Sequence, residues 1–444
     1  MLRTQEGKTV YALASGKAVA GVSVVRVSGP EARHVMHELA GDHIKPRYAS
    51  LAKLRKAGSG LVIDEGLVLW FPGPSSFTGE DVVEFHIHGS HAVVQVLFQE
   101  FEKFENLEAA NPGVFTRRAF LNGKMDLTQV EGLADLIHAE SEYQRQQALK
   151  HYEGYGSRKF NQWREDLKRC LAYLEICIDF SEEEFDDDLE ARLKAMIKKV
   201  MDEIETSIRQ AIDGERLRKG FRIVLAGDAN VGKSTLLNAL AKRDVAIVSN
   251  KPGTTRDILE VHLDLKGLPI IVTDTAGLRA TDEEIEKEGI KRALDRIEQA
   301  DLVINLLDGF TPETNKDYEN LLQRKAAIRV WNKIDLGRID GSGDDFRISA
   351  KTGEGLDKLI GYIYERAKNS ANKGLESVVI RERHKVALKT CLDELGTYFA
   401  FADDEIDLKA ESLRGAIGAI GGIVGNVGAE EILDVVFSDF CIGK

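Results

Sequence analysis

The sequence predicts a multidomain protein with an N-terminal α+β domain, a discontinuous all-α helical domain, and an α/β domain inserted into the helical one. Three observations predict this fold class. Residues 82–88 place mostly polar side chains on one face and apolar side chains on the other, as a half-buried strand does. Residues 119–214 and segments after residue 383 repeat apolar positions with a helical period. Between these helical parts, residues 221–234 join an apolar run to a glycine-containing loop. A chain of 444 residues is also too long for one ordinary core.

The N-terminal domain is expected to span residues 1–118. Its predicted strands are 22–27, 60–71 and 82–88, and its predicted helices are 31–40 and 91–104. Mixed strands and helices without a strict alternation favour an α+β arrangement.

One face of the strand 82–88 carries Glu84, His86 and His88, with His91 beyond it. Histidines in this spacing could bind zinc, but a strand with one solvated face gives the same pattern, and that interpretation is favoured. The same side chains could equally line a pocket for a small molecule. Arg26 and Lys124, each beside a turn, would add cations that suit an acidic ligand.

Helical sequence flanks the inserted domain on both sides. We predict one helical domain formed by residues 119–216 and 372–444, interrupted by residues 217–371. The alternative is two independent helical domains, but the second piece, of roughly 70 residues, is thin for a core of its own. Residues 370–374 are predicted to form a linker, and Gly421, Gly422 and Gly425 are expected to separate the last two helices.

Residues 227–234 read GDANVGKS, the pattern of a phosphate-binding loop. The apolar run 221–226 before it indicates a buried strand, and residues 235–242 after it indicate a helix. In such a loop the backbone N–H groups surround phosphate oxygens, Lys233 reaches the β- and γ-phosphates, and the Ser234 hydroxyl binds Mg²⁺.

Three further motifs follow in the order that a guanine-nucleotide switch requires. Residues 274–277 (DTAG) follow a strand and would approach Mg²⁺ and the γ-phosphate. Residues 332–335 (NKID) place a carboxylate, Asp335, that can accept two hydrogen bonds from guanine, and residues 349–351 (SAK) would close over the base. Together the motifs predict a Ras-like P-loop GTPase domain. The residues predicted to contact GTP are Asn230, Val231, Gly232, Lys233, Ser234, Thr235, Ser249, Asn250, Lys251, Pro252, Gly253, Thr254, Thr255, Asp274, Thr275, Ala276, Gly277, Asn332, Lys333, Asp335, Ser349, Ala350 and Lys351.

The position that holds a water-orienting Gln in the Ras-like pattern is Leu278 here, so the catalytic group must come from elsewhere. The acidic segment 281–288 could supply it, although acids are also common at a helix start, and spacing alone does not choose among them. Asn230 could help to hold a monovalent cation where other GTPases use an arginine finger. Arg256 could itself be such a finger, or a surface ion-pair partner.

Bulk composition limits the classes of function. The net charge of −13 argues against a broadly basic nucleic-acid binder. The sequence contains no apolar signal region and no run long enough to cross a bilayer, so we expect a cytoplasmic protein. Its cysteines form no CxxC pair, which disfavours a zinc or dithiol site. Cys170 and Cys177 share a helical face and are expected in a core.

Four segments resemble the MnmE/TrmE family of tRNA-modifying GTPases, and the resemblance spans the whole chain. They are residues 25–30 (VRVSGP), 77–84 (FTGEDVVE), 115–124 (FTRRAFLNGK) and 440–444 (FCIGK). The last two are specific to this family, whereas the GTPase motifs are shared with many relatives. Two departures are Ala229, where the family commonly has Pro, and residues 15–21, which replace a Pro- and Gly-rich turn.

The resemblance implies a homodimer that works with an FAD-dependent partner, MnmG, in a heterotetramer or larger assembly. The pair would place an aminomethyl or carboxymethylaminomethyl group on C5 of the tRNA wobble uridine. The carbon would come from 5,10-methylenetetrahydrofolate or 5-formyltetrahydrofolate, and dimerisation of the GTPase domains would promote K⁺-stimulated hydrolysis. By motif, Arg26, Glu84, Lys124 and Lys444 would contact folate, Ser234 and Thr255 would bind Mg²⁺, Asn230, Ser249, Lys251 and Thr254 would hold K⁺, and Glu286 would be the catalytic acid. Cys441 matches the terminal cysteine of the family, to which no role is assigned.

Two other functions remain to be weighed. A ribosome-assembly GTPase would share the nucleotide motifs but carry a basic RNA-binding module, whereas this chain ends in an acidic helical segment. A switch or scaffold protein without chemistry would use GTP only to change its binding.

Overall fold

The computed structural model describes residue 5 and residues 7–179, 187–228, 230–242, 246–247, 260–274, 296–309, 327–337, 345–425, 440 and 443. Contacts divide the chain into two compact units. The first consists of Met1–Ala134, Phe160–Glu165 and Arg414–Lys444, and the second of Asp135–Lys159 and Asp166–Leu413.

The first unit contains a six-stranded sheet with the order β3-β4-β5-β2-β1-β6. Its strands are β1 (Thr9–Leu13), β2 (Ala20–Ser28), β3 (Ser50–Arg55), β4 (Val62–Phe71), β5 (Val82–Gly89) and β6 (Leu107–Ala109). All neighbours are antiparallel except β1 and β6. The strands predicted at 22–27, 60–71 and 82–88 correspond to β2, β4 and β5. The short strands β1, β3 and β6 were not predicted.

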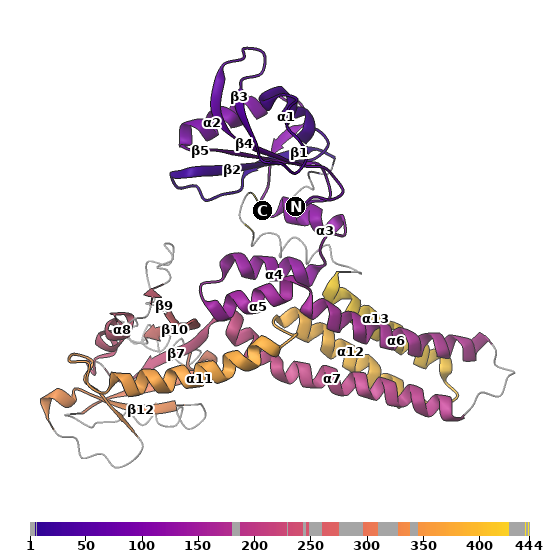
Figure 1. The fold of residues 1–444 in the computed structure, drawn as a ribbon. Helices are drawn as coiled ribbons and strands as arrows, with labels where there is room; N and C mark the ends of the chain where they lie inside the picture. Colours follow the sequence, from indigo (N-terminus) through magenta and orange to yellow (C-terminus); the bar gives the residue numbers. More distant parts are fainter. Residues whose placement is uncertain are drawn as a thin grey trace, which may run out of the picture. The chain divides into compact units, whose positions relative to one another are not determined.

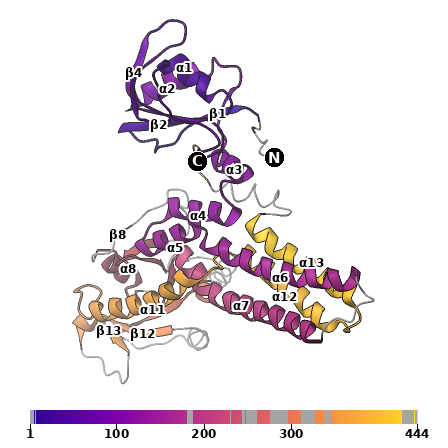
Figure 2. The same ribbon diagram turned by 45° about the vertical axis from the view of Figure 1, so that its right-hand side comes forward.

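The two faces of this sheet are covered by different helices (Figures 1 and 2). Helices α1 (Ala32–Ala40) and α2 (His91–Phe101) pack on one face, where Val25 and Phe85 are fully buried in the main core. Helix α3 (Val114–Leu121) packs on the opposite side, where Phe115 contacts β1. Because side chains alternate along a strand, Arg26 and Glu84 lie on the α3 side.

The second unit contains a seven-stranded sheet with the order β13-β12-β11-β7-β10-β9-β8. The strands are β7 (Phe221–Ala226), β8 (Ala246–Ile247), β9 (Glu260–Leu265), β10 (Leu268–Asp274), β11 (Leu302–Asp308), β12 (Ala327–Asn332) and β13 (Phe346–Arg347). Strands β10, β7, β11, β12 and β13 run parallel, and β9 is antiparallel to β10 and β8. Helices α8 (Lys233–Lys242) and α11 (Leu356–Glu376) pack against this sheet. Parallel strands end at one edge, which therefore gathers the loops that follow them.

The remaining helices are α4 (Leu127–His138), α5 (Glu142–Tyr152), α6 (Tyr155–Asp179), α7 (Asp187–Lys219), α12 (Glu382–Ala400) and α13 (Ile406–Val424). Ser141 begins α5, because its hydroxyl accepts a hydrogen bond from the Gln144 N–H at 3.4 Å. Helix α7 packs against α5, α11 and α12. None of the helices that the structure describes is long and apolar enough to span a membrane.

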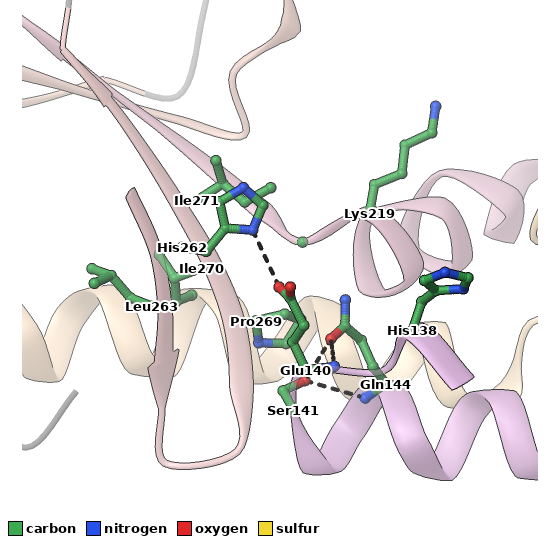
Figure 3. A pocket seen from close by; sticks show the side chains of 11 residues that line it. His138, Glu140, Ser141, Gln144, Lys219, His262, Leu263, Pro269, Ile270 and Ile271 are labelled. Carbon is green, nitrogen blue, oxygen red and sulfur yellow. Dashed lines mark hydrogen bonds and ion pairs between the residues drawn. The ribbon is translucent and has the colours of Figure 1, made fainter. Parts of the chain in front are cut away.

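The β9–β10 hairpin contacts the start of α5 within the second unit. The Tyr143 N–H donates to the Gly267 carbonyl at 3.0 Å, and His262 lies 3.2 Å from the Glu140 carboxylate. Figure 3 shows this ion pair beside a cavity of about 160 Å³ whose lining includes His138 and Lys219. The sheet is therefore anchored to α5 and to the residue pair before it through the turn and the first strand, β9, of this hairpin.

The predicted fold class is confirmed, while two local predictions are wrong. Residues 370–374 are not a linker, because α11 continues through them and Ala371 and Gly374 are buried. Gly421 and Gly422 do not end a helix, because α13 continues through both, and the positive φ of Gly425 (89°) follows its last residue. The predicted helix 429–437 lies outside the described residues. The domain boundaries at 118, 216 and 371 stay predictions.

Candidate functional site

The phosphate loop connects β7 to α8, as its sequence predicts. Gly232 has a φ of 101°, and a side chain there would collide with the Asn332 amide, so glycine is required at this turn. Val231, just before it, is buried in the core of the second unit. The loop is thus held on both sides by packed elements.

Lys233 is buried at the start of α8, and its Nζ donates to the carbonyls of Gly227 and Asp228 at 2.8 Å each. Burial lowers the pKa of the Lys233 ammonium, while Asp274 and Asp228 favour its charged form. The ammonium therefore lies across the mouth of the loop, where it would meet phosphate oxygens.

Ser234, in the first turn of α8, and Asp274, the last residue of β10, come together. The Ser234 hydroxyl donates to Asp274 Oδ2 at 3.2 Å, and Asp274 is buried at the end of β10. Two adjacent oxygens suit Mg²⁺, a cation that takes oxygen ligands. Thr255, the other predicted Mg²⁺ ligand, lies outside the described residues.

Asn332 connects the phosphate loop to the predicted base-binding loop. Its Nδ2 donates to the Val231 carbonyl at 2.8 Å, and its Oδ1 accepts from the Ala350 N–H at 2.9 Å. The side chain is buried and both ends are used, so its role is to brace two loops. The sequence motif predicted a contact with GTP and gave no sign of this bracing role.

The residues predicted to bind the base lie around the same edge of the sheet. Lys333 has a left-handed backbone (φ 69°), and its Nζ lies 2.7 Å from the Asp308 carboxylate. Asp335 is exposed on the 3-10 helix Ile334–Leu336. Ser349 is fully buried, and its hydroxyl accepts from the Thr352 N–H at 3.1 Å, which fixes the loop that carries Lys351. Asn230 is exposed beside the loop with a φ of 64°.

Several predicted residues lie outside the described part of the chain, so their placement stays a prediction. They are Ser249, Asn250, Lys251, Pro252, Gly253, Thr254, Thr255, Thr275, Ala276, Gly277, Glu286, Cys441 and Lys444.

A second polar site lies on the α3 side of the first unit's sheet. Arg26 and Glu84 are register partners on β2 and β5, and the Arg26 Nε and Nη2 donate to Glu84 Oε1 at 3.0 and 2.9 Å. The Arg26 guanidinium lies 5.3 Å from the centre of the Phe77 ring and 5.8 Å from that of Phe115. Lys124 lies beside the loop that carries Phe77 and Gly79: a Cβ built on Gly79 would be 3.4 Å from the Lys124 Cε. Three of the four predicted folate residues therefore lie around one loop and strand pair.

The histidines of β5 take separate partners. His86 Nε2 lies 3.4 Å from the Glu84 carboxylate, and His88 Nδ1 lies 2.8 Å from that of Asp64. Accepting hydrogen bonds from His88 lowers the pKa of Asp64 against the opposing effect of burial. Among the residues described, no three potential ligands gather to hold a metal. The interpretation of this strand as half solvated fits better than zinc binding.

Comparisons with known proteins cover the whole chain. The family model described as "GTP-binding protein TrmE N-terminus" matches residues 9–124, and "MnmE helical domain" matches residues 127–441. The tRNA modification GTPase MnmE of Azorhizobium caulinodans is 47% identical over 99% of this chain and 100% of its own. The protein of the same name from Methylobacterium radiotolerans is 44% identical over 99% and 100%.

A eukaryotic relative and a solved structure are also similar. The mitochondrial 5-taurinomethyluridine tRNA synthase subunit GTPB3 of Danio rerio is 41% identical over 98% of this chain and 93% of its own. A crystal structure of Era from Aquifex aeolicus, bound to GDP and aluminium fluoride, is 28% identical over 33% of this chain and 56% of that one, with a TM-score of 0.27.

Proposed function

Because the chain belongs to the MnmE family of tRNA modification GTPases, we propose that it hydrolyses GTP in order to modify the tRNA wobble uridine at C5. The observation that carries this proposal is the grouping of Lys233, Ser234 and Asp274 at one edge of the sheet, in a chain that matches its relatives end to end. The group added would be aminomethyl or carboxymethylaminomethyl, and an FAD-dependent MnmG-type subunit would take part.

Individual residues of the chain would each have a defined role in binding GTP and Mg²⁺. Lys233 would exchange its bonds to the Gly227 and Asp228 carbonyls for bonds to the β- and γ-phosphates. Ser234 would contribute its hydroxyl to Mg²⁺, with Thr255 as a second ligand, and Asp274 is close enough to support this ion. Asp335 would read guanine. Bound Mg²⁺ would neutralise the charge that develops on the phosphate oxygens.

Hydrolysis would depend on a potassium ion and on Glu286. Asn230, Thr254 and the backbone carbonyls of Ser249 and Lys251 would hold K⁺ when two GTPase domains meet, and Glu286 would orient the attacking water. Exchange of K⁺ for Na⁺ should slow GTP turnover by roughly tenfold or more. Glu286→Ala should lower kcat by roughly 100-fold with little change in nucleotide affinity. Equal turnover in the two salts would reject the cation, and a loss confined to affinity would reject the role of Glu286.

The folate would bind in the first unit. Glu84 offers only acceptors, which suit the amino and ring N–H groups of a pterin, whereas Arg26 and Lys124 suit carboxylates. Lys444 would join them, and this is consistent with the buried Gly443 lying against the backbone of Leu13 and Ala14. The carbon donor would be 5,10-methylenetetrahydrofolate or 5-formyltetrahydrofolate. Titration calorimetry with 5-formyltetrahydrofolate tests this site, and absence of binding to the intact protein would reject it.

Nucleoside mass spectrometry tests the function as a whole. Cells whose only copy carries Lys233→Ala should lose the wobble-uridine modification, whereas Lys242→Ala, an exposed lysine at the far end of α8, should preserve it. Normal modification with Lys233→Ala would favour a ribosome-assembly GTPase or a switch without chemistry.

A further inference from the structure

We infer that Arg118 is a positioning residue for the folate site, an inference that rests on the proposed function. Arg118 lies on α3 and is 7% exposed. It does not belong to the Arg26, Glu84 and Lys124 group. It instead binds the loop of residues 72–81 between β4 and β5, which borders that group on two sides.

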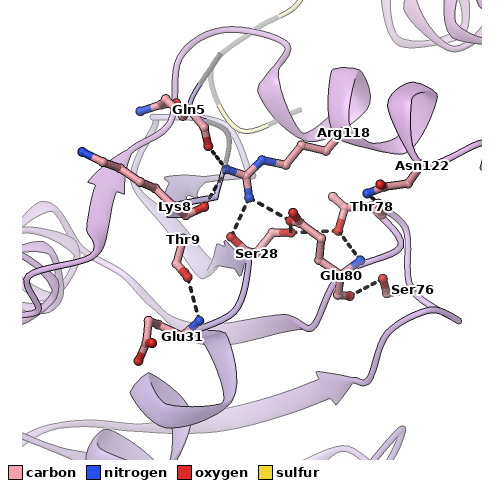
Figure 4. Close-up of polar contacts among 10 residues, drawn as sticks. All are labelled: Gln5, Lys8, Thr9, Ser28, Glu31, Ser76, Thr78, Glu80, Arg118 and Asn122. Carbon is pink, nitrogen blue, oxygen red and sulfur yellow. Dashed lines mark hydrogen bonds and ion pairs between the residues drawn. The ribbon is translucent and has the colours of Figure 1, made fainter. Parts of the chain in front are cut away.

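The guanidinium of Arg118 reaches three segments at once (Figure 4). Its Nη1 donates to the Glu80 carboxylate at 2.8 Å and to the Ser28 carbonyl at 3.1 Å. Its Nη2 donates to the carbonyls of Gln5 and Lys8 at 2.6 and 2.7 Å. One side chain thus ties the chain before β1, the end of β2 and the 72–81 loop together.

Buried hydroxyls extend this network into the loop. The Ser28 hydroxyl donates to Glu80 Oε2 at 2.8 Å and lies 2.8 Å from the Thr78 hydroxyl. Ser28 and Thr78 are fully buried. The Asn122 amide, just beyond α3, donates to the Thr78 carbonyl at 2.7 Å. Buried polar groups that are all paired favour one loop conformation over others.

The loop that Arg118 fixes carries the surroundings of the proposed ligand. Phe77 lies under the Arg26 guanidinium, and Gly79 lies against Lys124. A shift of this loop would move both cations relative to Glu84, although none of the three side chains is bound by Arg118. The expected consequence is weaker folate binding from a residue that makes no contact with folate.

The shape of the guanidinium, and not only its charge, should matter. The planar guanidinium of Arg118 donates hydrogen bonds in two directions from its two Nη atoms. A lysine ammonium is a single point, so it would lose the bonds either to Glu80 and Ser28 or to Gln5 and Lys8. Arg118→Lys is therefore expected to weaken binding of 5-formyltetrahydrofolate by about tenfold or more. Arg55→Lys, on an exposed arginine of β3 whose Nη1 donates to the Gly60 carbonyl at 2.9 Å, is the matched control and should bind as the wild type does.

Calorimetry on the full chain, combined with amide hydrogen exchange, tests the inference. Arg118→Lys should lose folate affinity and exchange faster within residues 72–81, while β2 and β5 keep their protection. Should Arg118→Lys fail to fold, Glu80→Gln replaces it, since it removes the charge that Arg118 binds and keeps one oxygen that can accept from Arg118 and from Ser28. For that variant we expect a smaller loss of affinity, about threefold, with faster exchange in the same loop.

The outcomes separate the two claims. If the wild type binds the probe and the variants bind equally well, the positioning role of Arg118 is wrong and the folate site stands. Loss of protection throughout the sheet would mean that Arg118 supports the whole unit, which also overturns the inference. If the wild type itself does not bind, the folate assignment fails first, and the role of Arg118 fails with it.

Discussion

Asp335 is exposed on a short helix after the braced residue Asn332, where a base could reach it. A carboxylate has only acceptors, which match the two N–H donors of guanine. Asp335→Asn replaces an acceptor with an amide donor, so GTP affinity should fall by about 100-fold, corresponding to about 3 kcal/mol. Xanthosine triphosphate, which carries a carbonyl where guanine has its amino group, should bind more tightly to the variant than to the wild type. Fluorescence titration with both nucleotides measures this, with Glu354→Gln as a nearby exposed control. An unchanged preference for GTP would show that Asp335 does not read the base.

The buried cysteines make a prediction about pH. Burial raises the pKa of Cys391 to about 12, with Glu394 adding to the effect, and raises that of Cys170 to about 11. Above pH 9 the unfolded chain loses these protons while the folded protein keeps them, so stability should fall as pH rises from about 9 to 12. Urea denaturation at pH 8 and pH 10 measures the fall, and Cys391→Ala should show a smaller one. If the difference in stability between the wild type and Cys391→Ala is the same at pH 8 and pH 10, the predicted effect of the Cys391 thiol is wrong. Cys170 is buried as predicted, whereas Cys177 is only partly buried.

The crossing of α7 and α11 depends on close backbone contact. The Gln147 amide on α5 donates to the Gly214 and Gly374 carbonyls at 3.0 Å each, so it bonds the two chain segments that lead into and out of the nucleotide-binding sheet. A Cβ on Gly374 would lie 2.5 Å from the Asp213 carbonyl oxygen and 3.0 Å from Leu217 Cβ. Gly374→Ala should therefore destabilise the protein by about 1–3 kcal/mol.

Gly361, on the same helix, supplies the control. It is exposed, and nothing lies within 4 Å of its added Cβ, so Gly361→Ala should stabilise by about 0.5–1 kcal/mol through helix propensity alone. Urea midpoints of the two variants should move in opposite directions. Shifts of the same sign would mean that the crossing is not tightly packed.

The element scale also shows where sequence reasoning succeeds and where it stops. Long apolar runs next to a motif, such as 221–226, are predicted well because the motif fixes what must precede it. The segment 370–374 was predicted as a linker because Ser, Asn and Gly favour loops, yet packing of Ala371 and Gly374 keeps it helical. Arg118 could not be singled out from sequence, because its four acceptors come from segments up to 113 positions away.

At the scale of the whole chain, a residue near the end of the sequence packs against residues near its start. Phe440 is 4% exposed, and Gly443, with a φ of 102°, lies against the backbone of Leu13 and Ala14 in the first unit. The sequence indicated a docked tail through its apolar residues, but it could not name the surface that receives it, because that contact joins positions far apart. The described part of the predicted nucleotide site could be located from sequence more readily, since each of its motifs is contiguous and follows a strand.

The contact of Gly443 with Leu13 and Ala14 predicts a specific effect of Gly443→Ala. A side chain at Gly443 would overlap the Leu13 carbonyl oxygen and lie 2.9 Å from Ala14 Cα, and a positive φ is itself unfavourable for alanine by about 1 kcal/mol or more. The undocked fraction of the tail should therefore rise by about tenfold or more. Carboxypeptidase B, which removes a terminal lysine, should release Lys444 correspondingly faster from the variant. Gly422→Ala is the control, since nothing lies within 4 Å of its added Cβ, and its rate should match the wild type. If the tail contributes to the proposed folate site, the affinity of Gly443→Ala for 5-formyltetrahydrofolate should fall as its cleavage becomes faster. Equal cleavage rates for Gly443→Ala and Gly422→Ala would mean that the tail is not held at Leu13.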